Sequence, residues 1–132
     1  MVKPIVTSLL AAARPYELAE FYSYAMDAKI VAGFNKSHWQ VTNSLGFKMQ
    51  IYKPSTKKSE PFKGNALSIC LYRPPSTNPI DALHNWCKEL LLKGAALCSE
   101  ITLDEFGAET WIADPEGNLF LLVVPSGNTL TP

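Results

Sequence analysis

Histidine and cysteine, the side chains that most often bind metals or act as nucleophiles, are few and scattered in this sequence. His38 and His84 share no ligand spacing such as H-x-x-x-H. The three cysteines, Cys70, Cys87 and Cys98, form no C-x-x-C pair, and their odd number predicts neither a disulfide framework nor a zinc site. We therefore expect reduced thiols that pack as small apolar side chains in a cytoplasmic protein.

Other arrangements that carry catalysis are missing from the sequence. It holds no nucleophile motif, no glycine-rich phosphate loop and no pair of carboxylates at a diagnostic spacing. Asp104, Glu105 and Glu109 are most simply explained as a solvated loop and a strand edge. The residue types favour binding over catalysis.

The composition indicates a small globular protein. The 132 residues are 47% hydrophobic, enough for one compact domain over residues 1–132. Twelve basic and twelve acidic residues give zero net charge without a basic cluster, which disfavours a nucleic-acid or anionic-membrane partner. No apolar stretch approaches the roughly 18 residues of a membrane span. The N-terminal stretch reads as a first strand rather than a secretory signal.

The clearest local signal is a hairpin near the end of the chain. Two apolar runs, Thr110–Ala113 and Leu119–Val124, flank the turn D-P-E-G-N. Asp114 can accept hydrogen bonds from the backbone ahead of it, Pro115 fixes φ at the corner, and Gly117 permits a positive φ. The pattern predicts two paired strands.

The remaining elements follow from apolar periodicity and from the positions of proline and glycine. A helical stripe follows Pro15, and a second stripe ends before Gly94. We expect helices at 15–26 and 80–93, and strands at 4–13, 29–34, 37–42, 46–53, 65–72, 96–101, 108–113 and 119–124.

The second half of the chain repeats the order of the first. Arg14-Pro15 is echoed by Arg73-Pro74, and the last strand of each half ends in Pro-Ser. A linker at 54–64 separates the halves. We predict an α+β fold of two βαβββ modules, module 1 at about 1–54 and module 2 at about 65–126.

The closing hairpin also resembles a known family. The string W-I-A-D-P-E-G-N-L-F-L-L is similar to the hairpin that closes the repeat of the glyoxalase/bleomycin-resistance/dioxygenase (vicinal oxygen chelate) family, D-P-x-G-N-x-x-E-L. The resemblance implies that the curved mixed sheets of two modules enclose a cleft. It also implies a homodimer, as in similar members of the family.

In metal-dependent members of that family, ligands lie on the first and last strand of each module. The resemblance carries these positions onto Thr7, Gln50, Ala66 or Leu67, and Leu121. None is a histidine or a carboxylate, the donors that transition metals prefer beside thiolate. We therefore predict no metal ion and no other cofactor in the cleft.

Strand parity suggests which side chains line the cleft. It places Gln50 and Tyr52 of module 1, and Trp111 of module 2, on the same side as the ligand positions Thr7 and Leu121. We expect Trp39 to face Trp111 as a second aromatic wall, and His38 beside it is a further candidate for ligand contact. The alternative is that both tryptophans are ordinary core residues.

The arginines at equivalent strand ends offer a weaker signal. Arg14 and Arg73 are suitably placed to bind an anion, but pairing with the nearby Glu17 and Asp81 is the simpler expectation.

Three functions stay open. The first is reversible, metal-free binding of a small, partly apolar molecule, as in the bleomycin-resistance branch. The second is a divergent lyase, isomerase or dioxygenase of the same fold. The third is a structural or interaction module with a filled cleft. The missing metal ligands favour the first and third.

Overall fold

The structure, a computed structural model, describes residues 3, 5–57, 59 and 67–127 of the chain. The chain divides into two compact units, Met1–Lys63 (unit 1) and Gly64–Pro132 (unit 2), each with one helix and one mixed sheet. The boundary falls in the predicted linker 54–64, most of which lies outside the described residues. A single domain and a cleft remain predictions.

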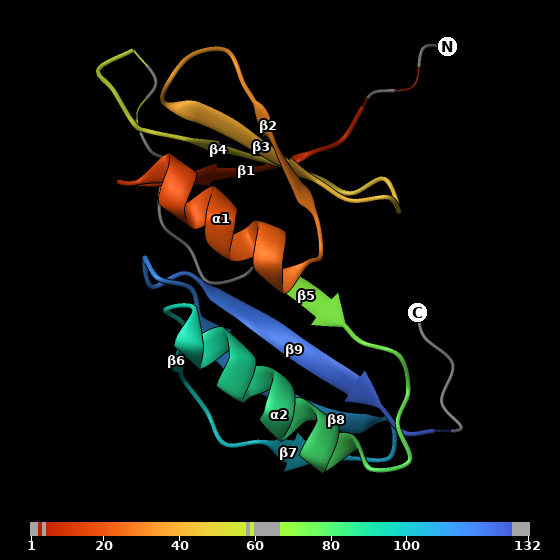
Figure 1. The fold of residues 1–132 in the computed structure, drawn as a ribbon. Helices are drawn as coiled ribbons and strands as arrows, with labels where there is room; N and C mark the ends of the chain where they lie inside the picture. The colour runs from red at the N-terminus through yellow and green to blue at the C-terminus, as the bar shows by residue number, and fades with distance from the viewer. Residues whose placement is uncertain (1–2, 4, 58, 60–66, 128–132) are drawn as a thin grey trace. The chain divides into compact units, whose positions relative to one another are not determined.

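Unit 1 has the predicted element order βαβββ. Its sheet has the strand order β1-β4-β3-β2, with β1 parallel to β4 and the other pairs antiparallel. Helix α1 covers one face of this sheet (Figure 1). The elements are β1 (Ser8–Ala11), α1 (Pro15–Ala25), β2 (Lys29–Ala32), β3 (His38–Thr42) and β4 (Lys48–Tyr52).

Unit 2 repeats this topology. Its sheet has the order β5-β9-β8-β6, with β5 parallel to β9, and β7 also pairs with β8. Helix α2 covers one face (Figure 1). The elements are β5 (Ile69–Tyr72), α2 (Pro79–Leu92), β6 (Ala96–Leu97), β7 (Thr102–Leu103), β8 (Gly107–Ala113) and β9 (Leu119–Pro125). The predicted α+β fold is confirmed.

Of the strand predicted at 96–101, only Ala96–Leu97 (β6) forms, and pairing with β8 resumes just beyond it, at Thr102–Leu103 (β7). The side chain of Ser99 causes the interruption, because its Oγ accepts a hydrogen bond from the backbone N–H of Trp111 at 2.9 Å. A side chain thus takes a place that the neighbouring strand would fill in a regular ladder.

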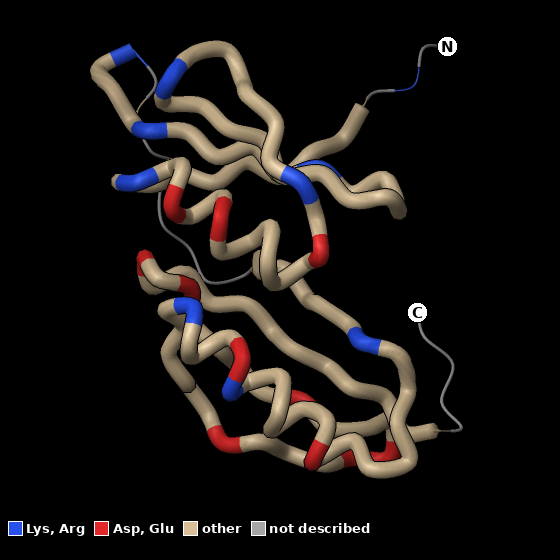
Figure 2. Tube along the Cα trace, in the orientation of Figure 1, with Lys and Arg blue, Asp and Glu red and all other residues tan. Residues whose placement is uncertain are grey.

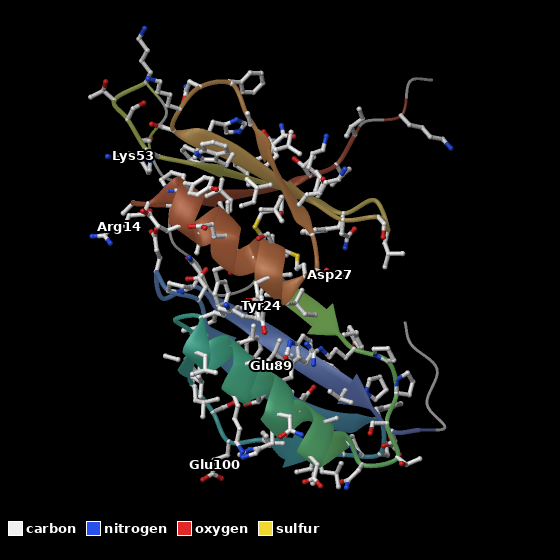
Figure 3. All side chains as sticks on the ribbon, in the orientation of Figure 1. Arg14, Tyr24, Asp27, Lys53, Glu89 and Glu100 are labelled. Carbon is white, nitrogen blue, oxygen red and sulfur yellow. The ribbon has the colours of Figure 1, made fainter. Side chains whose placement is uncertain are left out.

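Both helices begin and end close to the predicted residues. Pro15 and Pro79 occupy the first helical positions, where a missing N–H costs nothing. Asp27, which follows α1 (Figure 3), adopts φ +48, and Gly94 after α2 adopts φ +105. These left-handed residues end the helices.

Each unit has its own core between helix and sheet. The buried side chains of α1 and α2 meet the alternate residues of the strands that point toward them. Full burial of one such side chain contributes about 1.5–3 kcal/mol. The largest of them are Leu18, Tyr22, Met49 and Ile51 in unit 1, and Leu83, Trp86, Leu90, Ile112, Phe120 and Leu122 in unit 2.

The closing hairpin forms as the sequence predicts. Asp114 is 3% exposed, and its Oδ1 accepts hydrogen bonds from the N–H groups of Glu116 and Asn118, at 2.8 and 3.0 Å. Gly117 adopts φ +88. The turn is therefore held by one carboxylate, which fixes the register of β8 against β9.

Charged residues are distributed over both units. Both signs of charge occur in each unit, but in unit 1 the described Asp and Glu residues lie on α1 or just after it, whereas Lys lies on the strands and loops of the sheet (Figure 2). Among the described residues, neither helix has the length and apolar character needed to cross a membrane.

Candidate functional site: the open faces of the two sheets

Each sheet has one face that its helix does not cover, here called the open face of the unit. The register of the strands assigns residues to it, because side chains alternate between faces and paired residues point the same way. In unit 1 these are Leu9, Ala11, Lys29, Val31, His38, Gln40, Thr42, Lys48, Gln50 and Tyr52. In unit 2 they are Cys70, Tyr72, Ala96, Thr102, Glu109, Trp111, Ala113, Leu119, Leu121 and Val123.

A chain of hydrogen bonds runs across the open face of unit 1. The backbone N–H of Phe34 donates to His38 Nδ1 at 2.9 Å. His38 Nε2 lies 3.0 Å from Gln50 Oε1, and Gln50 Nε2 donates to Thr7 Oγ1 at 2.8 Å. Three predicted site residues, Thr7, His38 and Gln50, are therefore in one bonded group.

The direction of this chain follows from its first bond. A backbone N–H only donates, so His38 Nδ1 is an unprotonated acceptor and the neutral ring carries its proton on Nε2. Nε2–H then donates to Gln50 Oε1, which fixes the orientation of the amide and directs Nε2 toward Thr7. Every donor in the chain points toward Thr7.

Close packing holds the His38 ring in place. His38 is 4% exposed, and the Phe34 ring stacks on it with centroids 5.1 Å apart and planes at 21°. Gly33 lies against the imidazole, since a Cβ there would overlap His38 Nδ1 and lie 2.6 Å from the His38 carbonyl oxygen. Sequence reasoning missed Gly33 and Phe34. The only signal for them in the sequence was the adjacent pair Gly33-Phe34 a few residues before His38.

Tyr52 lies on the same open face, as predicted, but is largely buried. It is 4% exposed, and its hydroxyl donates to the backbone carbonyl of Ser59 at 2.9 Å. Its oxygen is thus engaged within unit 1.

The open face of unit 2 is mainly apolar. Cys70, Leu121 and Trp111 form one cross-strand row, and Tyr72, Val123 and Glu109 form the next. The prediction that Trp111 shares a face with Leu121 is confirmed, since the two residues are direct cross-strand partners. Trp111 is 39% exposed.

Cys70 is not an activated nucleophile. Desolvation raises the pKa of its thiol, a hydrogen bond with Tyr72 acts in the opposite direction, and the Glu109 carboxylate raises the pKa further. The pKa of Tyr72 is also raised, by desolvation first and then by Cys70 and Glu109. A reactive cysteine needs a lowered pKa. Cys70 is therefore a neutral thiol at pH 7.

The prediction that Trp39 lies on the open face is wrong. Trp39 pairs with Ile51, which belongs to the core between the sheet and α1, and its ring contacts Tyr16 of α1 with centroids 4.8 Å apart. The residue equivalent to Trp111 is Gln40, which pairs with Gln50 as Trp111 pairs with Leu121. A shift of one residue reverses the face of a strand residue.

The open faces do not fit a metal site of the kind that the resemblance implies. Leu9 pairs with Gln50 as Cys70 pairs with Leu121, so the equivalent of Thr7 is Ser68. The expected position was Ala66, which lies outside the described residues, or Leu67, which is 93% exposed.

The donors at the corrected positions are poor metal ligands. They are two hydroxyls, one amide already bonded at both ends, and the alkyl side chain of Leu121. In the part of the chain that the structure describes, no three or more His, Cys, Asp or Glu side chains gather closely enough to hold an ion.

Arg73 lies on the helix side of unit 2, not with the open face. Its Nη2 forms an ion pair at 3.0 Å with Glu89 of α2, which is labelled in Figure 3. Its guanidinium lies 4.5 Å from the centroid of the Trp86 ring. The predicted partner Asp81 instead accepts a hydrogen bond from Asn78 at 2.8 Å. Arg73 therefore forms its ion pair on the helix side of the sheet rather than with Glu109.

A groove of about 670 Å³ also opens in unit 2, between α2 and residues 97–101. It lies on the helix side of the sheet, and its lining includes Leu91, Leu97 and His84. His84 is exposed, as predicted.

Two βαβββ units, each with a helix on one face of a mixed sheet, define the class of fold. No protein-family model and no curated protein sequence matches the chain. Solved structures do match along nearly its whole length. A glyoxalase-related enzyme from Fulvimarina pelagi has a TM-score of 0.72 at 12% identity, covering 93% of this chain and 88% of that one.

Two further solved structures match over a similar share of the chain. A glyoxalase/bleomycin resistance protein from Albidiferax ferrireducens has a TM-score of 0.62 at 18% identity, covering 90% of this chain and 97% of that one. The fosfomycin resistance protein FosX from Listeria monocytogenes has a TM-score of 0.69 at 11% identity, covering 96% and 94%. The chain has the glyoxalase/bleomycin-resistance/dioxygenase fold, and at these identities the likeness shows the fold alone.

Proposed function

We propose that the protein binds a small, partly aromatic molecule reversibly and without a metal ion. The observation that carries this proposal is the position of Trp111. A large apolar side chain that is 39% exposed, beside Leu121 and Cys70 on a face that no helix covers, is a ready surface for a flat ligand.

The chemistry of the two faces supports binding over catalysis. Cys70 has a raised thiol pKa, and the imidazole of His38 is engaged at both nitrogens. A general base or nucleophile needs a free site within reach of substrate. Neither Cys70 nor His38 therefore offers the divergent-enzyme alternative an activated nucleophile or a free base.

The name of one structural relative is consistent with a binding role. The protein from Albidiferax ferrireducens is called a glyoxalase/bleomycin resistance protein. The third alternative, a purely structural module, is opposed by the exposure of Trp111, since a filled surface would cover this ring.

Trp111 itself supplies the test. Indole N–H signals of ¹⁵N-labelled protein are followed by NMR during titration with naphthalene-, quinoline- and indole-type compounds, and Trp111→Phe assigns the relevant signal. We expect at least one compound to shift the Trp111 signal. Trp111→Ala should weaken its binding by about tenfold, since stacking adds about 0.5–1.5 kcal/mol to the buried area.

Trp39→Phe is the matched control, because Trp39 packs against α1 and its replacement should leave the affinity unchanged. If no compound moves the Trp111 signal, or if Trp111→Ala binds the compound as tightly as the wild type, the proposed function is wrong.

A further inference from the structure

The hydrogen-bond chain of unit 1 ends in donors for which the described residues provide no acceptor. Thr7 Oγ1 accepts from Gln50 Nε2, so the proton of the Thr7 hydroxyl must point elsewhere. Gln50 Nε2 carries a second N–H besides the one that Thr7 accepts. Among the described residues, neither proton has an acceptor within hydrogen-bond distance.

The charge of the same face has one sign. Because Ser8 pairs with Met49, Thr7 comes beside Lys48. The side chain of Lys48 is half-buried. Lys29 lies on the same face, two strands further across the sheet. No acidic residue is among the strand residues of this open face that the structure describes. Two free donors and a lysine therefore share one region.

We propose that the open face of unit 1 is a binding site for the carboxylate of a small organic acid, held by Thr7 Oγ1–H, the second N–H of Gln50 and the charge of Lys48. An ionised carboxylate accepts hydrogen bonds and donates none, so it matches the two free donors beside Lys48. The residues of this site belong to unit 1, whereas Trp111 belongs to unit 2. The proposal stands even if no ligand binds at Trp111.

His38 is the positioning residue of this site. Its Nε2–H fixes Gln50 Oε1 at the inner end of the amide and so keeps the Nε2 donors at the outer end. With the amide reversed, the face would present an acceptor to the ligand, which would repel a carboxylate. The His38 tautomer, set by the N–H of Phe34, thus selects the ligand chemistry.

Benzoate is a suitable probe, with benzamide and toluene as neutral comparisons. The full chain, labelled with ¹⁵N, is titrated while the side-chain NH₂ signals of Gln50 are followed. We expect benzoate to shift them at lower concentration than benzamide, and toluene to leave them in place. Thr7→Val should weaken benzoate binding by about tenfold, as expected for the loss of a hydrogen bond to a charged group.

Two variants separate the hydroxyl from its surroundings. Thr7→Ser keeps the hydroxyl and should retain affinity within about twofold, since the bonded atoms are unchanged. Thr42→Val removes a hydroxyl that lies on the same open face but takes no part in the hydrogen-bond chain, and it should leave benzoate affinity unchanged. Equal benzoate binding in Thr7→Val and wild type would overturn the proposal.

The unliganded protein gives an independent check. The ¹⁵N spectrum of His38 should show an unprotonated Nδ1 and a protonated Nε2 at neutral pH. The opposite tautomer or an imidazolium would overturn the inference. A benzoate response at the Trp111 indole without one at Gln50 would contradict this inference while supporting the proposed function.

Discussion

The two open faces come from the same topology and yet differ in what they offer to a ligand. Unit 1 has a directed chain of hydrogen bonds at Thr7, His38 and Gln50. At the equivalent rows, unit 2 has Leu121 with Trp111 on one side and Cys70 on the other. One face is polar with lysines, and the other is apolar with a single carboxylate, Glu109. The backbone thus sets which positions face outward, and the residues at those positions decide the chemistry.

The largest effect on stability should come from Gly33→Ala, which disturbs the position of His38 on the open face of unit 1. The added Cβ overlaps the His38 ring and displaces it from Phe34 N–H and Gln50. Overpacking together with the lost hydrogen bonds should lower the free energy of unfolding by about 2–4 kcal/mol. Urea unfolding followed by circular dichroism measures the loss.

A matched control for Gly33→Ala is Gly46→Ala, where an added Cβ has no atom within 4 Å but φ is +93. That variant suffers only backbone strain and should keep the His38 tautomer. Wild-type stability in Gly33→Ala would show that the ring is not held as described.

A smaller effect is expected when the equivalent residues of the two faces are exchanged. Gln50→Leu leaves the buried Nε2–H of His38 without an acceptor and should lower the free energy of unfolding by about 1–3 kcal/mol. Leu121→Gln places the amide on a half-buried apolar face and should change it by no more than about 0.5 kcal/mol. Equal losses in the two variants would abolish the distinction between the faces.

The smallest effect concerns charge on the apolar face. Glu109→Gln removes a carboxylate that raises the pKa of Cys70, so this pKa should fall. The raised thiol pKa contributes stability that is fully present below the pKa of Cys70 in the unfolded chain and is lost as the pH rises through its pKa in the folded protein. In Glu109→Gln the pKa of Cys70 in the folded protein is lower, so this loss of stability should be complete at lower pH.

Alkylation of Cys70 by iodoacetamide as a function of pH, followed by mass spectrometry of its peptide, measures the shift. Glu105→Gln removes an exposed loop carboxylate and is the control. An unchanged Cys70 profile in Glu109→Gln would mean that the carboxylate lies too far from the sulfur to act on it.

The sequence predicted the elements well because their signals are local. Pro15 marks the start of one helix and Gly94 the end of the other. The turn at Asp114–Asn118 forms through the side chain of Asp114 itself. The prediction of a continuous strand at 96–101 was wrong. The strand is interrupted where the Ser99 side chain accepts a hydrogen bond from a residue of another strand, and no local sequence pattern shows such a contact.

The site was predicted less completely, for a physical reason. Parity counted from a fixed turn placed Trp111 correctly, but Trp39 was assigned by analogy between the modules, and an offset of one residue put it on the wrong face. The roles of Gly33 and Phe34 depend on the approach of two strands, which spacing along the chain does not encode.

The parallel pairing in each unit has a consequence for the order in which the faces assemble. Strands β3 and β4, or β8 and β9, are neighbours along the chain and close short loops, whereas Ser8 must reach Met49 and Ile69 must reach Phe120. Closing a long loop costs more entropy and comes later in folding. Thr7 precedes one late strand and Cys70 lies in the other. We therefore expect each face to be completed late in folding, when its parallel edge strand joins the sheet, and to lose that strand's side chains again if the strand frays.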